Sequence, residues 1–165
     1  MDLPKSPLFK DSSEKINIPQ IPIYELLKKY NGKKFTDDPI KGIKRRFTLL
    51  KLPQNLILYF KRFEKNNFFI EKNNTIVTFP IKNLSLEEYT KEETLNRDLN
   101  YDLINNIIHD GKPGQGTFRI QVRHKALDKW FDIQDLTINP IMPQSVVVSE
   151  SYIHIYESHR RETEN

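Results

Sequence analysis

The sequence predicts an α+β domain, built on an antiparallel β-sheet with a few helices. Three observations lead to this prediction. One early segment spaces its apolar residues as a helix does, several later segments alternate apolar and polar residues, and short polar stretches connect them. With 165 residues, 37% of them hydrophobic, the chain is long enough for one domain with a packed core.

The first expected elements are a helix and two strands. Apolar residues at i, i+3, i+4 and i+7 form one helical face, and Gly32 follows as a stop signal; the four are Ile23, Leu26, Leu27 and Tyr30. Residues 33–42 read as a loop. Two strand-like runs follow, separated by Pro53. The second run, residues 56–63, is apolar on both faces, which favours a central strand covered on both sides.

The middle of the chain predicts a hairpin and a short helix. Residues 68–72 and 75–79 are strand-like runs on either side of an Asn-Asn pair, which favours a turn. The segment "LSLEEYT" predicts a short helix, because Ser85 and Glu88 have the spacing of a capping box.

The C-terminal part predicts the rest of the sheet. Residues 101–109 form a strand, the glycine-rich loop 110–116 returns the chain, and residues 117–124 alternate with period two. The segments "KWFDIQD" and "SYIHIY" add two further strands. We expect residues 1–20 to be an extended arm, 21–157 the core of the domain, and 158–165 a frayed tail.

Composition excludes several classes of function. The chain has no cysteine, which removes disulfides, thiolate metal sites and a cysteine nucleophile from these residues. No run approaches 18 apolar residues, so we expect no contact with a membrane. The four histidines lack metal-ligand spacing, and the glycine loop joins two strands where a phosphate cradle needs a strand and a helix. We therefore expect neither metal nor cofactor.

Basic residues raise a separate hypothesis. The net charge is +4, and cations gather at Lys41, Lys44, Arg45 and Arg46, and again at Lys61 and Arg62. Such residues can neutralise RNA phosphates, or they can form a solvated face with interspersed carboxylates. Both interpretations remain open from the sequence.

The order of segments resembles a known family. "LPQNLILYFKRF", "TIVTFP" with "LSLEEYT", and "YDLINNIIHDG…GTFRIQVRH…KWFDIQD…SYIHIY" are similar to the C-terminal half of the ubiquitin-specific protease fold, from about residue 3 to residue 157. The resemblance implies a partial papain-like palm with part of the fingers. The family's cysteine nucleophile lies in an N-terminal thumb outside these segments, so we expect a fragment of a longer protein.

One branch of that family is most similar. "KRFEKNNFFIEKNNTIVTFPI" and "YDLINNIIHDGKPGQGTFRIQV" resemble the spliceosomal, ubiquitin-hydrolase-like proteins associated with the tri-snRNP. The resemblance implies a nuclear, non-catalytic interaction domain in pre-mRNA splicing, with tri-snRNP proteins as partners and ubiquitin binding that is weak or lost.

The positions of the family's catalytic groups support this implication. Active members carry Gly-His-Tyr after the glycine loop, and the matching residues here are Gly116, Thr117 and Phe118. An Asp or Asn normally stands four residues after the tryptophan, and counting from Trp130 that position is Gln134, while the next acidic residue, Asp135, is retained. Threonine cannot exchange a proton near neutral pH, and a neutral amide cannot stabilise an imidazolium. We therefore assign no catalytic residue.

The same positions suggest a surface for a partner. In active relatives the glycine loop flanks the ubiquitin tail, so the resemblance implies a binding surface at five residues: Gly111, Gly114, Gly116, Phe118 and Trp130. Two alternatives remain. A full-length protein could be an active deubiquitinase that uses His109 as its base, whereas His124, seven strand residues or roughly 23 Å from Thr117, is too far. The basic cluster could instead bind RNA.

Overall fold

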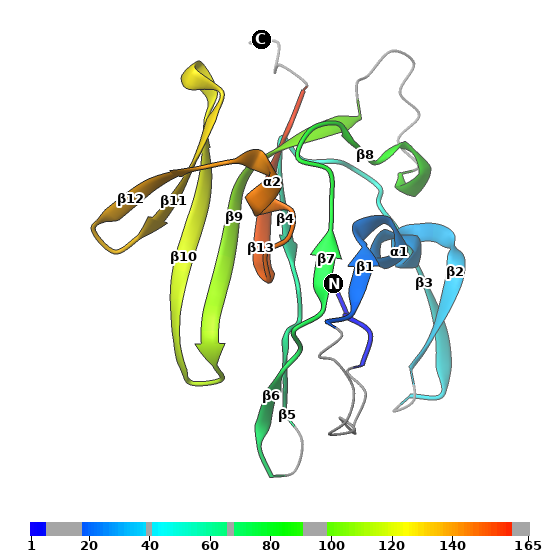
Figure 1. Cartoon of the computed structure of the whole chain (residues 1–165). Coiled ribbons are helices and arrows are strands. Elements are labelled where there is room, and N and C mark those ends of the chain that lie inside the picture. The colour runs from blue at the N-terminus through cyan, green and yellow to red at the C-terminus, as the bar shows by residue number, and fades with distance from the viewer. Residues whose placement is uncertain (6–17, 39–40, 66–67, 91–98, 160–165) are drawn as a thin grey trace.

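One antiparallel sheet makes up the larger part of the molecule (Figure 1), in a computed structural model that describes residues 1–5, 18–38, 41–65, 68–90 and 99–159. Its strands follow the order β12-β11-β10-β9-β13-β4, and β8 pairs with β9 beside this path. They are β4 (Asn55–Tyr59), β8 (Leu84–Ser85), β9 (Asn100–Lys112), β10 (Gln115–His124), β11 (Lys129–Gln134), β12 (Thr137–Ile141) and β13 (Ser151–Ser158). The antiparallel α+β prediction is confirmed.

Smaller elements surround this sheet. Strands β1 (Gln20–Pro22) and β7 (Ile76–Thr78) form a parallel pair, while β2 (Asn31–Asp38) with β3 (Ile43–Thr48) and β5 (Phe63–Lys65) with β6 (Ile70–Lys72) form two hairpins. The helices are short: α1 (Ile23–Leu27), η1 (Lys28–Tyr30), η2 (Glu87–Tyr89), η3 (Lys125–Leu127) and α2 (Pro143–Val146). Figure 1 shows both hairpins extending away from the body of the molecule.

The core lies between the large sheet and the layer that contains α1 and β7. The helical face predicted from residue 23 onward is present, because α1 buries Ile23, Leu26 and Leu27 completely or nearly so. These side chains join one cluster with residues of the sheet, among them Leu58, Phe60, Leu103 and Tyr156, and with Val77 and Phe79 of the β7 segment. Burial of this apolar surface is the main force that holds the two layers together.

Two local predictions were wrong at the hairpins. Residues 33–42, read as a loop, lie largely in the β2–β3 hairpin, whose charged residues hid its strand pattern. The second hairpin joins β5 to β6, and the Asn73-Asn74 pair is not its turn. Asn73 instead anchors the chain: its backbone N–H donates to Arg62 O at 2.7 Å, and its side chain donates to Pro4 O at 2.7 Å.

Strand β4 is an edge strand, which corrects the prediction of a central one. Among the strands of the described residues, β4 pairs with β13 alone, at the end of the strand order. Leu58 is buried, but Ile57 on the opposite face is 64% exposed. The apolar residues on both faces of this segment therefore did not indicate a central strand. An edge strand with one face open to solvent can carry the same pattern.

The short helix predicted in "LSLEEYT" forms in part. Leu84 and Ser85 belong to β8, and η2 follows at Glu87. Leu86 is the residue before η2, and no side chain caps the helix there. The capping box expected from Ser85 and Glu88 is therefore wrong, since Ser85 is held in a strand.

The two ends of the described chain contact the body. Leu3 is 7% exposed, and Asp2 accepts from Lys29 at 2.5 Å and Lys61 at 2.9 Å. Hydrogen bonds from these two lysines lower the pKa of Asp2 to about 2. Ser158 is buried at the end of β13. Residues 6–17 of the expected arm and 160–165 of the expected tail lie outside the described residues. The described helices include none long and apolar enough to cross a membrane.

Candidate functional site

The glycine-rich hairpin between β9 and β10 forms the rim of the candidate site. β9 continues to Lys112 and β10 begins at Gln115, so Pro113 and Gly114 alone make the turn. The predicted loop of residues 110–116 was too long, because Gly111 and Gly116 pair across the two strands. The φ angles of 104° at Gly111 and 75° at Gly114 lie in a region that L side chains rarely adopt, which explains both glycines.

Thr117 and Gln134 meet on neighbouring strands. Ile120 pairs with Ile133, and this register puts the two side chains on one face of the sheet. The Gln134 Nε2 atom donates to Thr117 Oγ1 at 3.2 Å. An alcohol and a neutral amide therefore occupy the two positions at which the resemblance places a base and its orienting partner. Neither group exchanges protons near neutral pH.

A network of fixed charges borders this pair. Asp110 lies directly across from Thr117, and the Nε atom of Arg119 donates to its Oδ2 at 2.5 Å. The other end of the guanidinium donates to Asp132. Burial alone would lower the pKa of Arg119, but the hydrogen bonds and ion pairs with both carboxylates outweigh it and raise that pKa. The charged groups next to Thr117 thus form ion pairs with each other.

His109 lies on the opposite face of the sheet from Thr117. Thr117 pairs with Asp110, and successive side chains of a strand alternate between faces, so residue 109 points the other way. Its ring is 5% exposed and lies between the rings of Phe63 and Phe118, each with its centroid 5.0 Å away. A Cβ atom on Gly116 would lie 2.2 Å from the imidazole. The histidine therefore fills the space that Gly116 leaves open.

The rim carries an aromatic ridge on the His109 side. Phe118 is 57% exposed, and its ring centroid is 5.9 Å from that of Tyr152. Tyr152 also contacts Tyr59, ring to ring at 5.1 Å, and donates its hydroxyl proton to the Tyr59 hydroxyl at 3.3 Å. That hydrogen bond, followed by burial, raises the pKa of Tyr152 to about 12. Phe118 belongs to the surface expected from the resemblance, but Tyr152 and Tyr59 were not recognised, since they come from strands far from it in the chain.

Trp130 and Asp135 differ from the other expected residues. Trp130 is 3% exposed and packs in the core, so little of its side chain is open to the partner expected there. It lines a hollow of about 390 Å³ together with Ile81, Lys82, Asp128 and residues in and beside α2. Asp135 is exposed in the turn between β11 and β12, with φ at 51°. The adjoining Leu136 is fully exposed.

Two buried polar residues were not recognised from the sequence. Arg62 is wholly buried, and its guanidinium donates to the carbonyl oxygens of Ser151 at 2.5 Å, Asn73 at 2.8 Å and Thr75 at 2.8 Å. Burial lowers its pKa to about 10. Its place in the predicted basic cluster is therefore wrong. His154 is also fully buried, and burial lowers its pKa to about 3.

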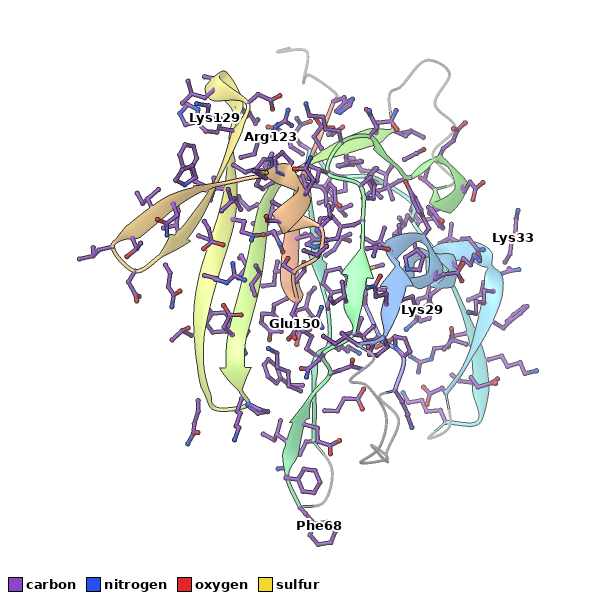
Figure 2. All side chains as sticks on the ribbon, viewed as in Figure 1. Lys29, Lys33, Phe68, Arg123, Lys129 and Glu150 are labelled. Atoms are coloured by element: carbon purple, nitrogen blue, oxygen red, sulfur yellow. The ribbon has the colours of Figure 1, made fainter. Side chains whose placement is uncertain are left out.

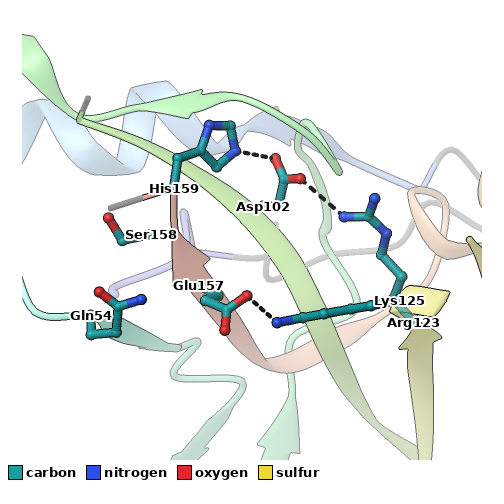
Figure 3. A pocket seen from close by; sticks show the side chains of 7 residues that line it. All are labelled: Gln54, Asp102, Arg123, Lys125, Glu157, Ser158 and His159. Carbon is teal, nitrogen blue, oxygen red and sulfur yellow. Dashed lines mark hydrogen bonds and ion pairs between the residues drawn. The ribbon is translucent and has the colours of Figure 1, made fainter. Parts of the chain in front are cut away.

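The remaining histidines lie at the other end of the sheet. His124 caps η3, where its Nδ1 atom accepts from the backbone N–H of Leu127 at 3.2 Å. His159 contributes to a hollow of about 460 Å³ (Figure 3), in which Asp102 contacts both His159 and Arg123, and Lys125 pairs with Glu157. These charges are matched within the hollow. Among the described residues, no group of His, Asp and Glu side chains could hold a metal ion.

The antiparallel sheet with its glycine hairpin has the fold of a partial ubiquitin-specific protease palm: the chain superposes on the yeast SAGA DUBm structure with a TM-score of 0.70 at 23% identity, over 86% of this chain and 34% of the other. The family model described as ubiquitin carboxyl-terminal hydrolase matches residues 9–156. The chain therefore belongs to the ubiquitin carboxyl-terminal hydrolase family.

Two curated relatives show what share of a related protein's length the chain covers. It is 48% identical to human ubiquitin carboxyl-terminal hydrolase 39 over 95% of the chain and 28% of that protein. It is 36% identical to the probable mRNA-splicing protein ubp10 of Schizosaccharomyces pombe, over 95% of the chain and 32% of that protein. The chain thus spans about a third or less of these curated relatives.

Solved structures carry the same fold. The crystal structure of an essential yeast splicing factor superposes with a TM-score of 0.69 at 23% identity, and the match covers 96% of this chain and 35% of the other. At this identity the match establishes the fold alone.

Proposed function

We propose that this chain is a non-catalytic, ubiquitin-hydrolase-like interaction domain that acts in pre-mRNA splicing, within the assembly of the tri-snRNP in the nucleus. The observation that carries the non-catalytic part is the hydrogen bond between Gln134 and Thr117. The two positions that would run proton transfer hold groups that bond to each other and do not titrate near pH 7.

The position of His109 supports the same conclusion. A substitute base must reach the reacting group within hydrogen-bond distance, directly or through one water molecule. The imidazole of His109 instead faces away from Thr117 and is enclosed by Phe63, Phe118 and Gly116. Moving it to the other face would require the register of β9 to shift by one residue, which would turn its other side chains as well.

The splicing role draws on the relatives. A probable mRNA-splicing protein and a yeast splicing factor both match at least 95% of the chain. Folds commonly keep their shape after a catalytic function is lost, and surfaces that once held substrate can hold a partner. The aromatic ridge of Phe118, Tyr152 and Tyr59 is the surface that we assign to a protein partner.

Affinity purification from nuclear extract tests this proposal. The tagged protein, in its natural full length, should recover tri-snRNP proteins, with a tagged unrelated nuclear protein as the control. Recovery of ubiquitin conjugates without tri-snRNP proteins would overturn the proposal.

A further inference from the structure

The net positive charge of the chain is concentrated in one hairpin. Residues 31–48, which contain β2 and β3, carry six Lys or Arg residues and two Asp residues, a net charge of +4. The whole chain has 26 basic and 22 acidic residues, so the rest of it carries 20 of each and is neutral. An even scatter of charge would not place the entire excess on one two-stranded ribbon.

The ribbon displays these cations on a rigid frame. Phe35 pairs with Arg46 and Asp37 with Lys44, so these four side chains share one face. Phe35, Lys44 and Arg46 are exposed, and Lys33 points away from the molecule (Figure 2). At the base of the ribbon, the ring of Phe47 lies 6.2 Å from that of Tyr30 and 5.3 Å from the Lys29 ammonium. These contacts fix the ribbon to the helical segment.

Most of the hairpin's cations have no carboxylate partner among the residues that the structure describes. Arg45 forms an ion pair with Asp38 at 2.8 Å. Within the described part of the chain, no carboxylate lies within 4 Å of the side-chain nitrogen of Lys33, Lys34, Lys41 or Lys44. The charged hollow at the end of the large sheet differs, since its cations are matched. A row of unmatched cations raises the local concentration of polyanions.

An exposed aromatic residue lies among these cations. Phe35 is 58% exposed, and the guanidinium of Arg46 lies 5.6 Å from its ring centroid. A guanidinium held near an aromatic ring is a combination on which nucleobases stack. An exposed phenylalanine ring does not help to keep neighbouring charges solvated, so a purely solvated charged face does not explain Phe35.

We propose that the β2–β3 hairpin is a binding face for single-stranded RNA, with Lys33, Lys44 and Arg46 on phosphates and Phe35 stacked on a base. Alternate residues of a strand are about 6.7 Å apart, which is similar to the step between phosphates of an extended strand. An unpaired strand is favoured, because stacking needs a free base and the deep groove of an RNA duplex is too narrow for side chains. The choice of RNA over DNA rests on the proposed function in splicing.

Fluorescence anisotropy with a labelled single-stranded RNA of mixed sequence tests the proposal. Three phosphate contacts predict a slope of log affinity against log salt of about −2.1, which is about a 20-fold loss of affinity between 50 and 200 mM salt. The double change Lys44→Gln, Arg46→Gln should make that slope shallower by about 1.4. Phe35→Ala should weaken binding about tenfold and leave the slope unchanged, because it removes a stacking contact and no charge.

The controls separate this proposal from general attraction to polyanions. Lys112→Gln with Lys129→Gln removes two exposed lysines of the large sheet and should leave RNA affinity unchanged. Circular dichroism verifies the fold of each variant. Equal losses from both double changes, or a Phe35→Ala affinity equal to wild type, would overturn the proposal. Displacement of the RNA by a polyglutamate peptide at the same concentration of negative charge would also overturn the proposal. RNA binding can fail while tri-snRNP recovery succeeds, so this test and that of the proposed function give distinct outcomes.

Discussion

The side-chain amide of Gln134 on β11 donates a hydrogen bond to the hydroxyl oxygen of Thr117 on β10, with 3.2 Å between nitrogen and oxygen. The resemblance to active relatives implies a catalytic pair at these two positions, but here both groups are neutral. Because proton transfer needs a group that titrates near the working pH, the pair can hold the local structure and cannot relay a proton.

Gly116→Ala should destabilise the fold by about 1–3 kcal/mol, the usual cost of overpacking. The added Cβ would lie 2.2 Å from the His109 ring. Urea unfolding measures the change. The double variant with His109→Ala should lose less stability than the sum of the two single variants, because the clash with the imidazole is removed, while the 2.4 Å approach to the Asp110 carbonyl oxygen remains.

Gly114→Ala is the matched control for that experiment. A Cβ at Gly114 would meet no atom within 4 Å, so only the strain of φ at 75° remains. His109→Ala should not rescue it. Equal rescue of both alanine variants would contradict the assigned contact between His109 and Gly116.

His154 should make the fold sensitive to mild acid. Burial lowers its pKa to about 3 from an ordinary 6.5, so the unfolded chain binds this proton more readily than the folded one. The contribution of neutral His154 to the free energy of unfolding is complete above pH 6.5. It is lost as the pH falls toward 3, by up to about 1.4 kcal/mol per pH unit. Comparing urea midpoints of wild type and His154→Phe from neutral to mildly acidic pH measures the difference. Parallel pH profiles would contradict this assignment.

Arg62→Met should destabilise the protein by about 3 kcal/mol or more, because three buried carbonyl oxygens lose their donor. Arg62→Lys should recover only part of the loss, since one ammonium cannot span all three acceptors in the plane that a guanidinium does. Chemical denaturation measures both. A stable Arg62→Met variant would show that the apolar replacement fills the site and that the three carbonyls find other donors.

Phe118→Ala should lower recovery of tri-snRNP proteins about tenfold, the loss expected when a central aromatic contact is removed. Quantitative immunoblotting of the purified complexes provides the measurement. Leu136→Ala is the control, since Leu136 is also exposed and apolar but lies in the β11–β12 turn. A larger effect from Leu136→Ala would place the interface there instead.

The sequence predicted the features that depend on local pattern. Period-two alternation located β10, and the helical spacing of Ile23, Leu26 and Leu27 located α1. Counting from Trp130 paired Gln134 with Thr117 correctly, because two adjacent antiparallel strands in regular register convert sequence spacing into contact.

Features that depend on distant contacts were not predictable. The pattern of residues 55–60 does not reveal which strands lie beside it, so β4 was expected in the centre of the sheet. Arg62 looks like a surface cation, and its burial depends on carbonyl groups of Asn73, Thr75 and Ser151 that only the fold brings together. The Phe118–Tyr152 contact is non-local for the same reason.

Cleavage of a fluorogenic ubiquitin substrate by the protein in its natural full length tests the central claim most directly. With Thr117 and Gln134 at the two proton-transfer positions and His109 on the opposite face, we expect no turnover above the buffer control. Turnover that disappears in the His109→Ala variant, while that variant stays folded and keeps its tri-snRNP partners, would contradict the account.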